Sequence, residues 1–261
     1  MNRLKCLFGK KKSDILSVYF TAGYPSPDVF EDTVKALVSR GVDMIEIGVP
    51  FSDPMADGPT IQESSAKALD KGMTLDLLLS KVAGIRESAG DTPLVLMGYL
   101  NPMLRYGIDR LFSRCKEVGI DALIIPDLPF AEYETEYKQR CRDNDLPMIM
   151  LITPATSEER IRFIDRNCDG FIYMVSVAAT TGTRERFEKE QIDYFKRVND
   201  MGLTHERLIG FGISNPETLG QAMAYSSGAI IGSLFIKCLT ASPDNPAEAV
   251  DRLMKTIGRA G

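Results

Sequence analysis

The feature of this chain that most limits how it folds is a regular alternation of short apolar segments with longer amphipathic ones along its 261 residues. The short segments are almost continuously hydrophobic, which is typical of parallel strands covered on both faces. The longer segments carry apolar residues at helical spacing. We therefore predict eight strands, over residues 15–21, 43–48, 93–98, 122–125, 148–152, 170–175, 208–210 and 229–231.

Each predicted strand precedes a predicted helix, and the eight helices cover residues 27–40, 75–87, 108–118, 133–144, 157–167, 190–201, 216–224 and 246–257. Eight units of about 33 residues fit an α/β fold of the (β/α)8 TIM-barrel type, which needs about 250 residues. An open, doubly wound sheet is the alternative. Polar or glycine-rich residues follow nearly every strand, and no GxGxxG motif follows the first, so the pattern favours the barrel.

The predicted barrel carries additional helices. Residues 2–10 would form a short helix that closes the bottom of the barrel, and residues 60–71 would form a helix inserted after the second strand. No proline- or serine-rich linker interrupts the chain, so we expect one catalytic domain over residues 1–261.

Composition excludes several function classes. The net charge of −5 gives no general attraction to nucleic acid or to anionic membranes, and no apolar run is long enough to span a bilayer. Five widely spaced cysteines without a CxxC motif, and an N-terminus unlike a signal peptide, lead us to expect a cytoplasmic protein with free thiols. His205 is the only histidine and lies in a polar stretch, so a two-histidine metal site is excluded, a Ser-His-Asp triad is disfavoured, and we interpret His205 as a surface-loop residue.

The second predicted strand contains a carboxylate, Glu46, among apolar neighbours. Alternate residues of a barrel strand point inward, so we expect Glu46 in the interior near the C-terminal mouth. Burial raises the pKa of a carboxyl group toward neutrality and suits it to acid–base catalysis. A buried ion pair with Lys or Arg explains the same pattern, and burial alone does not separate the two interpretations.

The loop after this strand contains a second candidate carboxylate, Asp57. Three prolines and a glycine within residues 50–59 make the loop stiff enough to hold a side chain in place. The loop would double back and place Asp57 over the barrel mouth. There Glu46 and Asp57, in different environments, would flank one substrate. Asp53 is the competing residue, but we interpret it as a side chain that bonds loop amides.

Glycines after the last strands indicate an anion site. Gly212 follows the seventh strand, and Gly232 with Ser233 follows the eighth, at the start of a predicted short helix over residues 233–240. TIM barrels often bind phosphate with these two loops and a helix N-terminus, through backbone amides and without a basic side chain. Gly182, after the sixth strand, would add further amides.

Aromatic side chains at strand ends would line an apolar pocket. Tyr99 follows the third strand, Tyr173 lies on the sixth, and Phe211 follows the seventh. Ordinary core packing explains any one of them equally well. Asp127, after the fourth strand, is either functional or a turn former.

Together these segments resemble the α chain of tryptophan synthase. The most specific motif is EIGVPFSDPMADGPTIQ at residues 46–62. The supporting motifs occur in the order of that family and extend the similarity over essentially the whole chain: TAGYP at 21–25, MGYLNP at 97–102, DLP at 127–129, GFGIS at 210–214 and GS at 232–233.

This resemblance implies a lyase of tryptophan biosynthesis that cleaves indole-3-glycerol phosphate to indole and glyceraldehyde 3-phosphate. It implies that Glu46 acts as acid and base, and that Asp57 bonds the indole N–H and stabilises positive charge on the ring. The implied substrate contacts are Met97, Tyr99, Tyr173 and Phe211 around the indole and Gly182, Gly212, Gly232 and Ser233 at the phosphate, with Asp127 as a further candidate.

The resemblance also implies a partner. This is a β chain that carries pyridoxal phosphate, in an αββα heterotetramer, whereas this chain itself would hold neither cofactor nor metal. The loop 53–58, the inserted helix and residues 101–105 would meet the β chain. One departure from the family is Ala179, where a second glycine is usual after the sixth strand, and it bears on loop closure and on coupling to the partner.

Three other functions stay open at this point. A different phosphate-binding barrel enzyme, such as an isomerase or an indole-glycerol-phosphate synthase, needs a lysine on a barrel strand, and the predicted strands contain none. A free-standing lyase that releases indole has the same sequence requirements as a subunit. A catalytically quiet subunit that activates a β partner would not need Glu46 and Asp57 together.

Overall fold

Eight parallel strands close into a barrel in the computed structural model, which describes residues 2–176 and 186–259. Each strand pairs with the next, and the last pairs with the first. The strands are β1 (Ile15–Thr21), β2 (Met44–Gly48), β3 (Leu94–Met97), β4 (Ala122–Ile124), β5 (Met148–Ile152), β6 (Ile172–Val175), β7 (Arg207–Gly210) and β8 (Gly228–Ile231). The predicted barrel is confirmed, and the open sheet is excluded.

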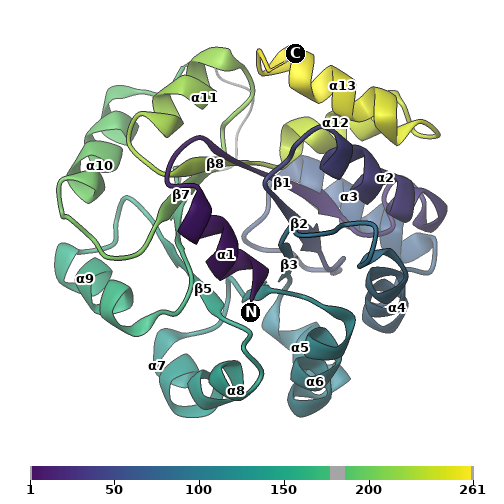
Figure 1. The fold of residues 1–261 in the computed structure, drawn as a ribbon, viewed down its shortest axis with the longest axis horizontal. Helices are drawn as coiled ribbons and strands as arrows, with labels where there is room; N and C mark the ends of the chain where they lie inside the picture. Colours follow the sequence, from purple (N-terminus) through teal and green to yellow (C-terminus); the bar gives the residue numbers. More distant parts are fainter. Residues whose placement is uncertain (1, 177–185, 260–261) are drawn as a thin grey trace.

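Helices form a ring around the barrel (Figure 1). The helices that follow the strands are α2 (Phe30–Ser39), α4 (Leu75–Ile85), α6 (Ile108–Val118), α8 (Lys138–Asp143), α9 (Glu158–Asn167), α10 (Lys189–Asn199), α11 (Pro216–Met223) and α13 (Pro246–Thr256). The additional elements are α1 (Arg3–Lys10), the 3-10 turn η1 (Pro27–Val29), α3 (Pro59–Asp70), α5 (Leu100–Tyr106), α7 (Phe130–Glu132), the π turn η2 (Tyr133–Tyr137) and α12 (Ser233–Ala241). None of these helices is long and apolar enough to cross a bilayer.

Local capping chemistry sets several of these boundaries. The Ser157 hydroxyl accepts a hydrogen bond from the Arg160 amide and so begins α9. Asn215 and Thr218 cap α11 reciprocally, with Pro216 in its first turn. Both signals are readable in the sequence, and both helices begin where they indicate.

Two helical segments differ from the prediction. Residues 101–105, which none of the predicted helices covers, lie in α5, whose first amide, that of Leu100, donates to Asp127 Oδ1 at 2.9 Å. The capping carboxylate comes from the loop after β4, so no neighbouring residue in the sequence announces this helix. The helix predicted over 133–144 instead begins with α7 at Phe130 and passes through the π turn η2 before α8.

Helix α1 crosses one end of the barrel, the end that faces the viewer in Figure 1. Asn2 caps the helix and donates from Nδ2 to the backbone oxygens of Asp121 and Asp145. The buried Asp121 carboxylate accepts from Arg3, from Arg86 and from the Leu94 amide. The predicted closure of the barrel bottom by residues 2–10 is therefore confirmed.

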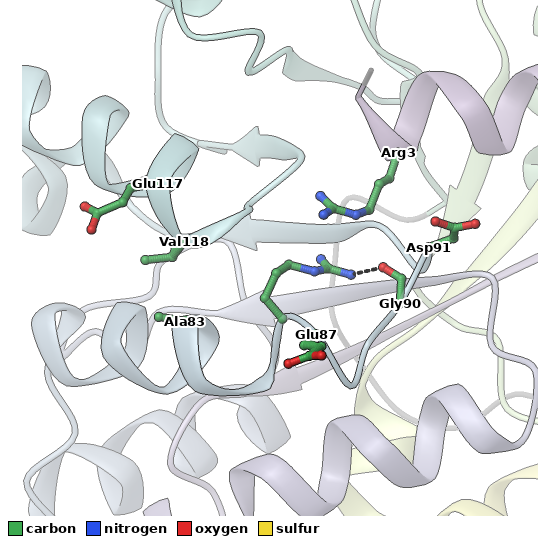
Figure 2. Close-up of a pocket in the computed structure, with 8 residues that line it drawn as sticks. Arg3, Ala83, Glu87, Gly90, Asp91, Glu117 and Val118 are labelled. Atoms are coloured by element: carbon green, nitrogen blue, oxygen red, sulfur yellow. Dashed lines mark hydrogen bonds between the residues drawn. The ribbon is translucent and has the colours of Figure 1, made fainter.

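A cavity of about 560 Å³ lies at this end, lined by Arg3, Arg86 and residues of α4, α6 and the turn that follows α4. Figure 2 shows Arg3 and Gly90 there. The Arg86 guanidinium donates to the Gly90 oxygen. Burial, and next the charge of Arg3, lower the pKa of Arg86 to about 10. The cavity adjoins the N-terminal ends of the strands, so it is separate from the mouth at which the candidate carboxylates were predicted.

Asp121→Asn is expected to lower the free energy of unfolding by about 2 kcal/mol, because two guanidinium groups and an amide lose a charged acceptor. Urea denaturation measures this loss. Asp145→Asn is the matched control, since Asp145 forms an exposed ion pair with Lys5 of the same helix α1. Loss of this pair is expected to cost less than about 1 kcal/mol. Equal losses in the two variants would contradict a special role for Asp121.

Candidate active site

The inner face of β1 carries polar side chains. Ser17 and Tyr19 alternate with residues that face the helices, as the contact between Phe20 and Phe30 of α2 shows. On the neighbouring strand, Glu46 lies opposite Tyr19 in the register. The two strands therefore bring a serine, a tyrosine and a carboxyl group into one part of the barrel interior.

Glu46 is fully buried, as the sequence predicted. The Ser17 hydroxyl donates to Glu46 Oε1 at 2.8 Å, while Glu46 Oε2 is buried without a hydrogen-bond partner among the described residues. Burial raises the pKa of Glu46 to about 8, against the opposing effect of the Ser17 hydrogen bond. No lysine or arginine of residues 2–176 and 186–259 forms an ion pair with it, which disfavours the alternative of a structural ion pair.

Asp57 is held by a tyrosine from the next strand's end. The Tyr99 hydroxyl donates to Asp57 Oδ2 at 2.9 Å and accepts from the Ala56 amide at 2.9 Å. The Tyr99 ring packs against Phe51, with 5.3 Å between the ring centroids. Burial raises the pKa of Asp57 to about 6, and the hydrogen bond from Tyr99 limits the rise.

The two carboxyl groups thus differ in their protonation at neutral pH. With pKa values of about 8 and about 6, Glu46 is mostly protonated at pH 7 and Asp57 is mostly ionised. Asp57 also keeps part of its surface in contact with solvent, whereas Glu46 has none. Two carboxyls with their pKa values set apart by environment are typical of an acid and a charge stabiliser that serve one substrate.

Two tyrosine rings lie close to both carboxyl groups. Burial, and then the negative charges of Glu46 and Asp57, raise the pKa of Tyr173 well above its ordinary value. Burial and the charge of Asp57 do the same for Tyr19, against a hydrogen bond with Thr21. Tyr173 also packs edge-on against Phe211, with 6.2 Å between the centroids. The structure therefore brings Glu46, Asp57, Tyr173 and Phe211 together as the sequence predicted.

The remaining predicted contacts lie around this centre. Met97 ends β3 and is buried, and Tyr99 follows it closely. Asp127 is exposed and lies in a turn that the Leu128 amide closes by donating to the Ile125 oxygen, as its turn-forming interpretation expected; it also caps α5 through the Leu100 amide. Asp53 is exposed and accepts from the Ser52 hydroxyl, where a bond to loop amides was expected.

The predicted anion site consists of a turn and a helix start. Phe211 and Gly212 follow β7 with φ angles of 68° and 77°, and the Ser176 hydroxyl donates to the Phe211 oxygen at 2.6 Å. Such angles are strained for a phenylalanine, and strain of this kind is concentrated at functional sites. Gly232 and Ser233 begin α12, where Ser233 is exposed. Gly182 and Ala179 lie outside the described residues.

Ser17 and Tyr19 are site residues that the sequence reasoning missed. Their signal was present, because Ser17, Tyr19 and Thr21 occupy alternate positions of an otherwise apolar segment. A period of two marks one face of a strand, and polar residues on that face of a barrel strand point inward. His205 was interpreted as a plain surface residue, but it is partly buried and its Nδ1 lies 3.1 Å from Asp165 Oδ1.

The described part of the site offers no cluster of metal ligands. Across the described ranges, no group of three or more histidine, cysteine, aspartate or glutamate side chains is placed to hold one. The donors that the site does offer are backbone amides, hydroxyls and two carboxyl groups, a set suited to an organic substrate with an anionic end.

Comparison with known proteins identifies the family. A family model described as tryptophan synthase alpha chain matches residues 7–260. The tryptophan synthase alpha chain of Parabacteroides distasonis is 53% identical over 257 residues, which are 98% of this chain and 99% of that relative. The alpha chain of Flavobacterium psychrophilum is 49% identical over 257 residues, covering 98% and 100%.

Solved structures agree with this match over the same length. Tryptophan synthase subunit alpha from Legionella pneumophila str. Paris superposes with a TM-score of 0.89 at 32% identity, covering 100% of this chain and 98% of that one. The tryptophan synthase A-subunit of Pyrococcus furiosus superposes with a TM-score of 0.86 at 31% identity, covering 95% and 98%. A family model that spans nearly every residue, and relatives about half identical over their full length, show that the chain belongs to the tryptophan synthase alpha chain family.

Proposed function

We propose that this chain cleaves indole-3-glycerol phosphate to indole and glyceraldehyde 3-phosphate, the carbon–carbon lyase reaction of its family, with Glu46 and Asp57 in separate roles. The observation that carries the proposal is the pair of carboxyl groups with different pKa values in one barrel interior. Family membership supports the reaction, and the site geometry supports the assignment of roles.

Glu46 is suited to deliver and accept the protons of this reaction. Because its pKa is raised to about 8, it holds a proton at pH 7 that it transfers to the indole carbon C3. Once ionised in the buried site, it becomes a base strong enough to take the glycerol hydroxyl proton as the C–C bond breaks. The ring protonated at C3 accepts the electron pair of that bond, so this chain needs no cofactor.

Asp57 is suited to stabilise the charge that develops on the ring. Its carboxylate is ionised at neutral pH and is held by the Tyr99 hydroxyl, so its free oxygen accepts from the indole N–H. The apolar walls for the ring are Met97, Tyr99, Tyr173 and Phe211. We assign the phosphate to the amides near Gly212 and Gly232 and to the Ser233 hydroxyl, with Gly182 as a further member.

Indole release from indole-3-glycerol phosphate by the purified chain tests this proposal, with and without a β chain. Indole formation in the presence of the partner is the expected result. Activity without the partner would identify a free-standing lyase. The absence of indole even with a competent β chain would overturn the proposal and favour a quiet subunit that only activates its partner.

A bell-shaped pH dependence of kcat/KM is expected, with limbs near pH 6 and pH 8. Activity falls below the lower limb because Asp57 takes up a proton, and above the upper limb because Glu46 loses one. Tyr99→Phe removes a donor to ionised Asp57 and is expected to raise the lower limb by about half a pH unit. A shift of the upper limb alone would contradict this assignment.

We propose that the partner is a tryptophan synthase β chain, assembled as an αββα heterotetramer, and that the β chain carries the pyridoxal phosphate. Two large apolar side chains are exposed near the barrel mouth, Met55 in the loop after β2 and Leu104 on α5. Large apolar side chains exposed in this way are typical of a protein interface. The described cysteines are unpaired and mostly buried, which supports action in the reducing cytoplasm.

Met55→Asp is expected to weaken binding of the β chain about tenfold or more, because a charge replaces a side chain that is 91% exposed in the free chain. Calorimetric titration with the β chain measures this loss. Leu77→Asp is the control, since Leu77 is also an exposed apolar residue but lies on α4, at the outside of the barrel. Equal weakening in both variants would rule out a specific interface at Met55.

A further inference from the structure

The buried carboxyl of Glu46 has two unequal oxygens. Oε1 accepts a hydrogen bond from the Ser17 hydroxyl at 2.8 Å, and Oε2 has no partner among the described residues although it is buried. An unpartnered polar atom in a barrel interior costs free energy, so its retention indicates a use. Ser17 itself is fully buried and sits on β1 closer to the N-terminal end of the strand than Tyr19.

We propose that Ser17 is a positioning residue for the proposed acid–base role of Glu46, on which the inference rests: it occupies Oε1 and thereby confines the transferable proton to Oε2. A hydroxyl that donates to Oε1 is compatible with the ionised carboxylate and with the neutral acid, provided that the proton of the acid is on the other oxygen. The hydrogen bond also fixes the plane of the carboxyl group, so Oε2 keeps one direction through the reaction.

The arrangement of the neighbours supports this direction. Ser17 approaches Glu46 from the side of the barrel floor, because it precedes Tyr19, which lies opposite Glu46 in the register. The other titratable groups that face this region are Tyr19, Tyr173 and Asp57, through their charges and rings. None of the three forms a hydrogen bond with Glu46 among the described residues, so Ser17 is its direct hydrogen-bonding neighbour there.

Ser17 also tunes how readily the proton leaves. A hydroxyl donor stabilises a carboxylate more than it stabilises the neutral acid, so it opposes the large rise in pKa that burial causes. Without Ser17, Glu46 would hold its proton more tightly and would be a weaker acid toward indole C3.

The test compares wild type with Ser17→Ala in the complex with a β chain. The expected result is an upper limb of the pH profile moved upward by about one pH unit, with kcat about tenfold lower and KM changed less than about twofold. Ser227→Ala is the matched control. The Ser227 hydroxyl donates to Glu206 Oε2, so this substitution also removes a serine–glutamate hydrogen bond, but one outside the site. That control is expected to leave both limbs in place.

A second measurement separates this inference from the proposed function. Infrared difference spectroscopy follows the carboxyl stretch of Glu46 in the isolated chain, with Glu46→Gln to assign the band, and needs no turnover. An upward shift of this titration in Ser17→Ala supports the inference even if no indole forms. An unchanged pKa of Glu46 in Ser17→Ala would overturn the inference. A lowered pKa would also overturn it, because it would show that the serine accepts the proton of the neutral acid.

Discussion

Glu46→Gln is expected to lower kcat for indole release by at least about 1000-fold and to make the folded chain more stable at pH 8. Gln has nearly the same shape and its oxygen still accepts from the Ser17 hydroxyl, so the fold around the site is retained. It carries no transferable proton, so the acid and base steps are both lost. Activity falls while stability rises, because burial of the carboxyl group favours catalysis but destabilises the folded chain.

The pH window of the stability effect follows from the raised pKa of Glu46. Below pH 4.5 the carboxyl is protonated in the unfolded and folded chains, and its contribution to stability is fully present. Between 4.5 and about 8 the unfolded chain has lost the proton and the folded chain retains it, so stability falls as the pH rises. Relative to wild type, Glu46→Gln is therefore expected to gain about 3 kcal/mol between pH 5 and pH 8.

Urea denaturation at both pH values and steady-state kinetics measure the two effects. Glu63→Gln is the control, because Glu63 forms an exposed pair with Lys67 on α3 and its substitution is expected to change neither quantity. Full activity in Glu46→Gln would refute the catalytic role. Loss of activity with no change in the pH dependence of stability would show that Glu46 is ionised in the folded chain.

The strands and most helices were predictable because their signals are local. Apolar segments, caps such as Ser157 and prolines in first turns all lie within the element that they define. Helix α5 was not predictable in this way, since its capping carboxylate, Asp127, comes from another loop of the barrel. Contacts of this kind exist only after the chain has closed, and a single sequence does not display them.

The candidate site also combines local signals, which the sequence displays, with contacts that form only in the folded chain. Glu46 and Asp57 stand out because a carboxylate in an apolar strand and a stiff proline-rich loop are visible in the sequence. The order of their pKa values depends on burial and on two donors from elsewhere in the barrel, Ser17 on β1 and Tyr99 after β3. The polar period of two in β1 would have indicated Ser17, but not the oxygen to which it donates.

The close approach of a tyrosine and a glycine fixes the other side of this site. A Cβ atom placed on Gly210 would overlap the Tyr173 hydroxyl and the adjoining ring carbons. A Cβ atom on Gly48 would overlap the Tyr19 hydroxyl and ring in the same way. Both tyrosines are buried, so a side chain at either glycine would displace a packed ring. The absence of a side chain at Gly210 is thus what allows Tyr173 to reach toward the two carboxyl groups.

Gly210→Val is accordingly expected to lower kcat/KM by about 100-fold or more and the free energy of unfolding by about 3 kcal/mol. Gly210 ends β7, and its φ angle is not in the left-handed region, so a valine suits the backbone there. The loss therefore arises from displacement of Tyr173. In the double variant with Tyr173→Ala, the stability is expected to return by more than half, while activity recovers only in part because the ring contact is gone.

A double-mutant cycle on Gly210 and Tyr173, measured by urea denaturation and by indole release, tests this explanation. Gly84→Ala is the control, since Gly84 lies in α4 with open space around its Cα and the change is expected to be neutral or slightly stabilising. Additive losses in the double variant would show that valine acts through something other than Tyr173. Strong coupling, with stability restored ahead of activity, would show that the glycine serves to place the tyrosine ring and that the ring serves the substrate.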